Sequence, residues 1–255
     1  MTLTDFDLTG RRALVTGGGD GLGRQLTGAL VDAGASVVIC GRRTEPLQET
    51  IADLGPAVTA CQADVTNPDD VTRLVEFAGD IDILVNNAGL SDRAPWQDVE
   101  SDKWRWIMTL NVESPFWLMQ QLVPGMIERG WGRVINVASV YGLVAGDASR
   151  YPGIGLDIAS YFASKHALVG LTKFMAAQLG PTGVTVNALC PGMFPSPANT
   201  QTLQPAVIDA LESGTPVARL GTERDLRSAI LFLAAPSSGF VTGHNLVVDG
   251  GWTIW

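Results

Sequence analysis

The chain has 255 residues, of which 46% are hydrophobic, and it carries a formal net charge of −9 at pH 7. This size and composition suffice for one large α/β domain over residues 1–255 with a sizeable buried core. The negative charge disfavours a nucleic-acid surface, because phosphate binding relies on clustered Lys and Arg side chains.

The N-terminal residues and the apolar runs predict a cytoplasmic protein without a membrane partner. Residues 1–10 are polar and acidic and do not resemble a secretion signal, which begins with basic residues and continues into an apolar run. No uninterrupted apolar stretch reaches the roughly 20 residues that a membrane span needs.

Cysteine and histidine placement predicts no metal site. The three cysteines, Cys40, Cys61 and Cys190, are far apart and lie in or beside apolar runs, which is typical of small buried side chains. His166 and His244 lack partners at the helical spacing of a zinc site.

Short runs rich in Val, Ile and Ala alternate with longer segments of helical periodicity. The runs that we expect to form buried strands are Ala13–Val15, Ser36–Cys40, Ala57–Cys61, Ile83–Val85, Val134–Val137, Val184–Ala188 and Leu246–Val248. Gly21–Ala33 has a helical apolar face, and Asn67 followed by Pro68 marks the start of another helix. This alternation predicts a doubly wound, mostly parallel sheet of about seven strands with helices on both faces.

The residues that follow these strands are candidates for the functional site. In a doubly wound sheet, ligands bind outside the carboxyl ends of the strands, where the strand order reverses. At these positions the chain has a glycine-rich turn at 16–23, Asn86–Gly89, Ser139, and Pro191 with Gly192.

The glycine-rich turn suits a pyrophosphate group. Glycines let backbone N–H groups approach the phosphates, and the N-terminus of the following helix is positive. However, the spacing of Gly17, Gly21 and Gly23 differs from G-x-G-x-x-G, and glycine runs are also plain turns. Taken alone, the turn is compatible with nucleotide binding and with a plain structural turn.

Tyr161 and Lys165 form a candidate acid/base pair. A spacing of four residues places both side chains on one face of a helix. A free tyrosine has a pKa of about 10, so a nearby cation must favour its phenolate if it is to act near neutral pH. We expect Lys165 to lower the tyrosine pKa; the alternative is an ordinary amphipathic helix.

The combination of motifs resembles the short-chain dehydrogenase/reductase family over nearly the whole chain. The matching segments, in chain order, are Thr16–Gly23 (T-G-x-x-x-G-x-G), Asn86–Gly89 (N-N-A-G), Asn111, Ser139, Tyr161–Lys165 (Y-x-x-x-K), Pro191–Gly192 and Val248–Gly251. This resemblance implies a Rossmann-type domain and hydride transfer between a nicotinamide cofactor and a small carbonyl or alcohol substrate.

By this resemblance, the catalytic residues are Asn111, Ser139, Tyr161 and Lys165. Ser139 would hydrogen-bond the substrate oxygen while Tyr161 donates a proton to it in reduction. Lys165 would also hold the cofactor ribose, and Asn111 would anchor a water leading towards solvent. The implied cofactor-binding residues are Gly17, Gly19, Asp20, Gly21, Leu22, Gly23, Arg42, Asp64, Val65, Asn87, Ala88, Gly89, Tyr161, Lys165, Pro191 and Gly192.

The end of the second strand predicts NADP(H), with NAD(H) as the alternative. Gly41 stands where an acid would hold the ribose of NAD, and it is followed by Arg42 and Arg43, which suit a 2′-phosphate. Asp20 argues the other way, since phosphate-preferring relatives often have a basic residue in the turn. Asp64 has a second interpretation as the cap of the turn that follows it.

A long segment separates Ser139 from Tyr161. It has 21 residues, where most relatives have roughly a dozen. Because it joins two catalytic elements, we expect it to lie near the substrate and to select it, with Arg150 as one polar contact and with little contribution to stability. It resembles most the gluconate 5-dehydrogenase kind of sugar-acid and polyol dehydrogenase; the alternative is a tolerated surface loop.

Tryptophans suggest further roles. Trp96 is a candidate for the substrate pocket, whereas Trp104, Trp106 and Trp117 are expected to pack in the interior. Trp252 and Trp255 follow the last strand, where related proteins build subunit contacts, and the resemblance implies a homotetramer, with a dimer second.

Two other functions share these motifs. A 3-oxoacyl thioester reductase would differ only in a pocket that admits a long acyl chain. A nucleotide-binding regulator would keep the fold without catalysis, although such proteins usually lack the tyrosine or the lysine, and both are present here.

Overall fold

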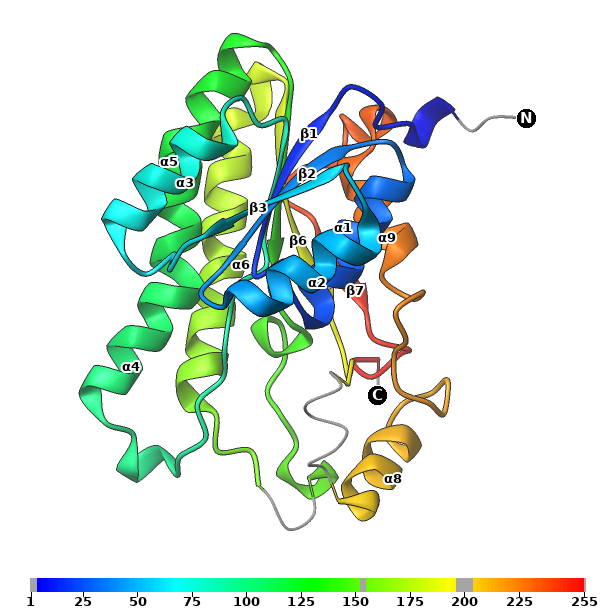
Figure 1. The fold of residues 1–255 in the computed structure, drawn as a ribbon. Coiled ribbons are helices and arrows are strands. Elements are labelled where there is room, and N and C mark those ends of the chain that lie inside the picture. The colour runs from blue at the N-terminus through cyan, green and yellow to red at the C-terminus, as the bar shows by residue number, and fades with distance from the viewer. Residues whose placement is uncertain (1–3, 152–154, 196–203, 255) are drawn as a thin grey trace.

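Seven parallel strands form one sheet in the order β3-β2-β1-β4-β5-β6-β7 (Figure 1). The computed structural model describes residues 4–151, 155–195 and 204–254, apart from the side chain of Arg150. The strands are β1 (Arg12–Thr16), β2 (Ser36–Gly41), β3 (Val58–Gln62), β4 (Ile83–Asn86), β5 (Gly132–Val137), β6 (Val184–Pro191) and β7 (Asn245–Val248). Each predicted run forms a strand, and the doubly wound parallel sheet is confirmed.

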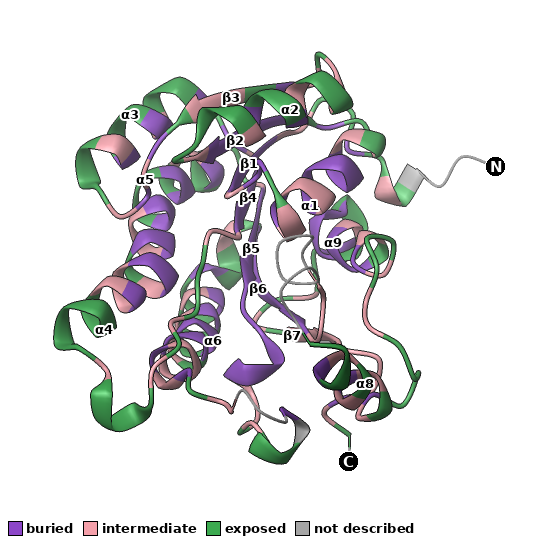
Figure 2. Ribbon diagram, turned by 60° about the horizontal axis from the view of Figure 1, so that its bottom comes forward, coloured by how far each residue is buried: buried purple, intermediate pink, exposed green. Residues whose placement is uncertain are grey.

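Helices cover both faces of the sheet (Figure 2). One face is packed by α1 (Gly21–Asp32), α2 (Thr44–Leu54) and α9 (Arg227–Ala234). The other face is packed by α3 (Pro68–Ala78), α5 (Ser114–Glu128) and α6 (Ala159–Leu179). Two further helices, α4 (Ser101–Met108) and α8 (Pro205–Ser213), lie towards the end of the sheet where the strands terminate.

Burial on both faces explains the continuous apolar character of the strands. Leu14 and Ile83 have no exposed surface, and their neighbours in β1 and β4 pack against helices on opposite sides. The predicted helix start at Asn67 is confirmed: its Oδ1 accepts the backbone N–H groups of Asp69 (2.9 Å) and Asp70 (3.4 Å).

The strand order places the candidate residues at one edge. From β1 the chain adds β2 and β3 on one side, and it then crosses to add β4 to β7 on the other. The reversal therefore lies between β1 and β4, where their carboxyl ends leave a crevice. The turn after β1 and the residues after β4, β5 and β6 all reach this edge.

Neither a membrane-spanning helix nor a metal-binding cluster is found in the described residues. Within 4–151, 155–195 and 204–254, no helix is both long and apolar enough to cross a membrane. The same ranges contain no group of three or more His, Cys, Asp or Glu side chains placed to hold a metal ion.

Candidate active site

The turn between β1 and α1 can only be made with glycine at its tightest point. A Cβ on Gly23 would lie 2.0 Å from the carbonyl oxygen of Gly17, and Gly17 itself has a φ of +63°. The Nδ2 of Asn87 donates to the carbonyl oxygens of Thr16 (2.9 Å) and Gly17 (3.2 Å), which fastens this turn to the end of β4. These contacts fix the backbone of the turn beside the N-terminus of α1.

Two adjoining cavities of about 210 and 310 Å³ run along this edge. Together they are lined by every residue predicted to bind the cofactor. The smaller has Gly17, Gly19, Asp20, Arg42, Asp64, Val65, Ala88 and Gly89 in its wall. The larger has Gly17, Asp20, Gly21, Leu22, Gly23, Asn87, Ala88, Gly89, Tyr161, Lys165, Pro191 and Gly192. A Cβ at Gly17 or Gly23 would meet the turn's own backbone or the residues Asn87 and Ala88, so this turn requires glycine. A glycine turn at a helix N-terminus fits a group that binds through backbone N–H groups.

Basic side chains stand at the far end of the smaller cavity. Arg42 follows Gly41, the last residue of β2, and its guanidinium carbon lies 5.8 Å from the centroid of the Trp106 ring. Arg43 forms an ion pair with Asp20, so the acid in the glycine turn is neutralised by the second arginine. Trp106, which we expected only to pack, also lines this cavity.

The catalytic candidates converge where the larger cavity begins. Ser139 follows β5, and its Oγ accepts the backbone N–H of Tyr141 (3.1 Å). Tyr161 and Lys165 lie in the first turns of α6, with the Lys165 Nζ 5.5 Å from the tyrosine ring centroid. That Nζ donates to the carbonyl oxygen of Val137 (2.8 Å), so the lysine is fixed to the end of β5.

Asn111 lies in a π-helical segment, Thr109–Glu113, between α4 and α5. Its Nδ2 donates to the Oγ of Ser164 (2.9 Å) and to the carbonyl oxygen of Leu90 (3.0 Å), and its Oδ1 accepts the Leu90 N–H (3.1 Å). It is buried and lines none of the cavities. Ser164 was not identified from sequence, and its only signal there is its position next to Lys165 on the same predicted helix.

Burial acts on both members of the Tyr161 and Lys165 pair. It raises the pKa of Tyr161, and a hydrogen bond from Ser139 opposes this effect. It lowers the pKa of Lys165 to about 8. We expected Lys165 to lower the pKa of Tyr161, but in this structure that pKa is raised. Desolvation of the phenolate dominates, and the Lys165 ammonium donates its hydrogen bond to Val137.

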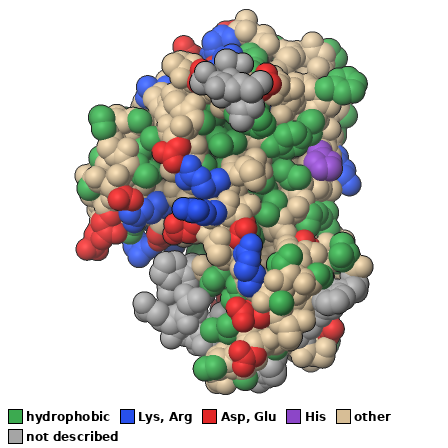
Figure 3. All heavy atoms as spheres, turned by 90° about the vertical axis from the view of Figure 1, so that its right-hand side faces the viewer, with side chains coloured by type: hydrophobic (Ala, Val, Ile, Leu, Met, Phe, Trp, Pro, Cys, Tyr) green, Lys and Arg blue, Asp and Glu red, His purple; other side chains and the backbone are tan. Residues whose placement is uncertain are grey.

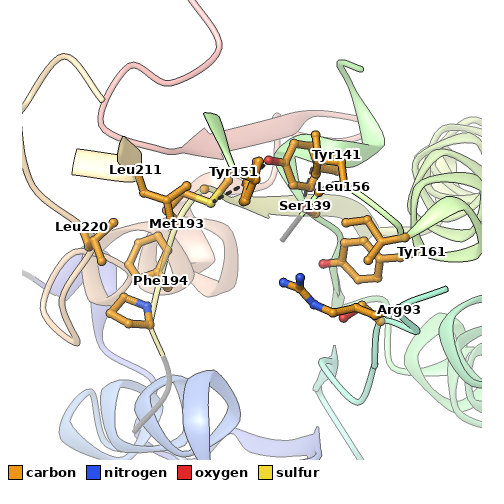
Figure 4. Close-up of a pocket in the computed structure, with 15 residues that line it drawn as sticks. Arg93, Ser139, Tyr141, Tyr151, Leu156, Tyr161, Met193, Phe194, Leu211 and Leu220 are labelled. Carbon is orange, nitrogen blue, oxygen red and sulfur yellow. Dashed lines mark hydrogen bonds between the residues drawn. The ribbon is translucent and has the colours of Figure 1, made fainter. Parts of the chain in front are cut away.

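A third cavity of about 460 Å³ adjoins the second (Figure 4). Ser139 and Tyr161 line both of them, so their hydroxyl groups stand where the two cavities meet. The remaining lining residues are Ser91, Arg93, Tyr141, Tyr151, Gly155, Leu156, Ile158, Gly192, Met193, Phe194, Pro195, Leu211 and Leu220. A molecule in this cavity can reach both hydroxyls and the neighbouring cofactor cavity.

Known proteins are similar to this chain in sequence and in architecture. Residues 11–206 match the short chain dehydrogenase family. The gluconate 5-dehydrogenase of Gluconobacter oxydans (strain 621H) is 37% identical over 257 residues, which cover 98% of this chain and 97% of that protein. The chain belongs to the short-chain dehydrogenase family. It is accordingly an NAD(P)-dependent oxidoreductase acting on CH–OH groups or the corresponding carbonyls.

Other short-chain dehydrogenases are similar to a comparable degree. The 3-oxoacyl acyl-carrier-protein reductase of Vibrio cholerae is 34% identical over 251 residues, covering 96% of this chain and 98% of that protein. A solved structure of a gluconate 5-dehydrogenase from Burkholderia cenocepacia J2315, in complex with NADP and tartrate, is 38% identical. It covers 99% of both chains with a TM-score of 0.88.

The long segment before Tyr161 does lie at the third cavity, but it also supports the structure. Tyr151 is only 7% exposed, shares a hydrogen bond with the hydroxyl of Tyr141 and meets the Trp252 ring edge-on at 6.5 Å. The expectation that this segment contributes little to stability is therefore wrong. Residues 152–154 and the side chain of Arg150 lie outside the described part of the chain, so the proposed contact of Arg150 stays a prediction.

Two predicted residues have other surroundings. Trp96 is 73% exposed and is not among the lining residues, so its placement in the substrate pocket is wrong. Asp64 accepts the N–H (2.9 Å) and hydroxyl (2.7 Å) of Thr66, as its capping interpretation required, and it also lines the smaller cavity. Trp252, which we expected near a subunit contact, is buried within its own chain in an apolar cluster with Tyr151, Val207 and Leu211. Trp255 lies outside the described residues.

Arg93 and Phe194 line the third cavity and were not identified from sequence. Tyr141 and Tyr151 also line it, and both belong to the segment between Ser139 and Tyr161 that we expected to lie near the substrate. Only the folded chain brings these three segments to the same cavity.

Proposed function

We propose that this short-chain dehydrogenase transfers hydride between NADP(H) and a small polar carbonyl or secondary alcohol, with Tyr161 as the acid/base. The observation that carries the proposal is that the Ser139 and Tyr161 hydroxyls line both the cofactor cavity and the third cavity. A substrate oxygen placed between them meets one hydrogen-bond donor and one proton donor. The nicotinamide, when bound, supplies or accepts the hydride.

The direction of the tyrosine pKa favours reduction at neutral pH. Burial raises this pKa, so the phenol keeps its proton and is ready to donate it to a developing alkoxide. Alcohol oxidation requires the phenolate instead, and its rate should increase as the pH rises. Tyr161→Phe removes only the hydroxyl and should abolish this increase.

Lys165 and Asn111 have supporting roles in the proposal. Lys165 lines the cofactor cavity. We propose that its ammonium hydrogen-bonds the ribose hydroxyls of the cofactor and exchanges protons with Tyr161. Asn111 is hydrogen-bonded to Leu90 and Ser164 beside this lysine, and we assign to it the anchoring of a water that leads from Lys165 to solvent. Lys165→Met should therefore impair both cofactor affinity and turnover.

The preference for NADP(H) rests on the end of β2. Gly41 offers no carboxylate there, and Arg42 lines the cavity in which the adenosine ribose would lie. Asp20 opposes a phosphate less than its charge suggests, because it is paired with Arg43. The solved relatives with NADP bound support the same cofactor. Arg42→Ala should weaken NADP(H) binding and spare NAD(H), and a catalytic efficiency with NAD(H) equal to that with NADP(H) contradicts the proposal.

The substrate is proposed to be a sugar acid, a polyol or another small polar ketone. Gluconate and 2-dehydro-3-deoxy-D-gluconate 5-dehydrogenases are 37% identical to the chain. A 3-oxoacyl thioester reductase remains the alternative, supported by the apolar side chains of Leu156, Leu211 and Leu220 in the cavity wall. A panel of ketoses, sugar acids, ketones and 3-oxoacyl esters, followed by cofactor absorbance, distinguishes the two.

We also infer one domain over residues 1–255, a homotetramer and a cytoplasmic location. One sheet that runs from Arg12 to Val248 supports the single domain. Phe174 and Phe240 have large exposed apolar surfaces, and Figure 3 shows further hydrophobic side chains on one face, interspersed with charged ones. Light scattering after size exclusion tests the tetramer, and cell fractionation tests the location.

The decisive experiment for the function is Tyr161→Phe. Folding and cofactor affinity should survive, while turnover should fall by at least about 100-fold, which is typical of losing a general acid/base. A variant that binds NADP(H) and keeps a near wild-type rate refutes the proposed mechanism.

A further inference from the structure

Arg93 borders the third cavity together with the reacting hydroxyls. It lies in the segment between β4 and a short helical turn, Trp96–Asp98. The next residue, Ala94, donates its N–H to the carbonyl oxygen of Asp157 (2.9 Å), so this segment is fastened to the long segment before Tyr161. Figure 4 shows the Arg93 side chain extending into the cavity, and the residue is exposed to solvent.

The charge of Arg93 is not compensated by the part of the chain that the structure describes. It is the one charged side chain among the described lining residues, whose other polar groups are hydroxyls. Unlike Arg105 and Arg129, which pair with aspartates, it forms no ion pair or hydrogen bond with a described residue. Although the protein has a net charge of −9, the Arg93 guanidinium makes this cavity locally positive, and a positive cavity attracts an anion.

We propose that Arg93 binds the carboxylate of the substrate, so that hydroxy acids and keto acids are preferred over neutral polyols, ketones and thioesters. This rests on the proposed function and narrows its substrate class. A guanidinium presents two parallel N–H donors that match the two oxygens of a carboxylate. One cation compensates the single charge of a carboxylate and leaves a phosphate partly unneutralised.

Two separate contacts also determine which carbon reacts. Ser139 and Tyr161 hold the reacting oxygen at one side of the cavity, and Arg93 holds the carboxylate at another point of its wall. Only a substrate whose reacting carbon lies at the matching distance from its carboxylate satisfies both. Arg93 is thus a specificity-determining residue, which selects both the acid and the position along its chain.

The test compares acids with neutral molecules of the same skeleton, such as gluconate with glucitol and 3-hydroxybutyrate with 2-butanol. The wild-type kcat/KM should favour the acid. Arg93→Met should lower kcat/KM for the acid about 10- to 100-fold, as expected for a lost hydrogen bond to a charged group, mainly through KM. The loss for the neutral partner should be at least tenfold smaller. Arg93→Lys should restore part of the activity on the acid, and Arg224→Met, an exposed arginine outside the cavity lining, should have no effect.

Binding of tartrate to the NADP⁺ complex supplies a readout that does not need turnover. Its dissociation constant, from calorimetry, should rise about tenfold or more in Arg93→Met while that of NADP⁺ stays unchanged. Equal losses on acids and neutral molecules, a wild-type preference for neutral substrates or for 6-phosphosugars, or unchanged tartrate binding would each overturn the assignment of Arg93. A panel with no turnover at all would refute the proposed function, and tartrate binding would still decide the role of Arg93.

Discussion

Replacing the buried Lys165 by methionine should make the protein more stable at neutral pH while it removes a residue of the proposed site. Lys165 is 4% exposed, and burial lowers the pKa of its ammonium from 10.5 to about 8. Below pH 8 the ammonium is charged in both the folded and the unfolded chain. The folded chain then carries the full cost of desolvating that charge.

The magnitude follows from the pKa difference. Each pKa unit corresponds to about 1.4 kcal/mol, so a lowering from 10.5 to about 8 represents about 3 kcal/mol of destabilisation at pH 7. Methionine avoids this cost but leaves the carbonyl oxygen of Val137 without the Lys165 hydrogen bond, a loss of about 1 to 2 kcal/mol. The free energy of unfolding should therefore rise by about 1 to 2 kcal/mol in Lys165→Met.

The pH dependence gives the sharper comparison. Between pH 8 and 10.5 the unfolded chain binds one more proton than the folded chain at this site, so the wild type gains stability as the pH rises. The advantage of Lys165→Met should be constant below pH 8 and should shrink above it. Urea unfolding at pH 7, 8, 9 and 10 measures this difference, with the exposed Lys173→Met on the same helix as the control. A Lys165→Met protein that is less stable than wild type at pH 7, or a difference that does not change with pH, refutes the reasoning.

Three further predictions concern the turn, the cavity wall and the pH profile. Gly23→Ala places a Cβ 2.0 Å from a backbone oxygen, so NADP(H) affinity, measured by fluorescence titration, should fall more than about tenfold, whereas Gly170→Ala, with open space around it, should not change it. Gly221→Ala places a Cβ 2.4 Å from the ring of Phe194, which lines both the substrate cavity and the cofactor cavity. The steady-state KM values for substrate and cofactor should therefore both rise. Unchanged KM values would show that the ring can move aside. The rate of alcohol oxidation should increase with pH, because the pKa of Tyr161 is raised by burial, and a pH profile that stays the same in Tyr161→Phe would assign the titrating group elsewhere.

Local sequence patterns are enough to predict the sheet and the order of its motifs. Apolar runs such as Val134–Val137 need no tertiary information to be recognised, because strands buried on both faces are apolar throughout. The glycines of the turn and the spacing of Tyr161 and Lys165 are equally local, since backbone freedom and helical periodicity act over a few residues. The residues that directly follow strands, at the glycine turn, Asn86–Gly89, Ser139 and Pro191–Gly192, were also predicted to meet at one edge, as they do.

The surroundings of these residues depend on contacts between segments that are distant in the chain. Arg93 and Phe194 line one cavity although they lie far apart in the chain, and no periodicity or motif marks them as substrate contacts. The same applies to the direction of the Tyr161 pKa, which depends on how much water the packed chain excludes and on where the Lys165 ammonium is directed. Burial and long-range contacts arise only when the fold brings distant elements together. Local sequence patterns therefore predict which residues gather at the site, but their pKa values depend on the packing around them.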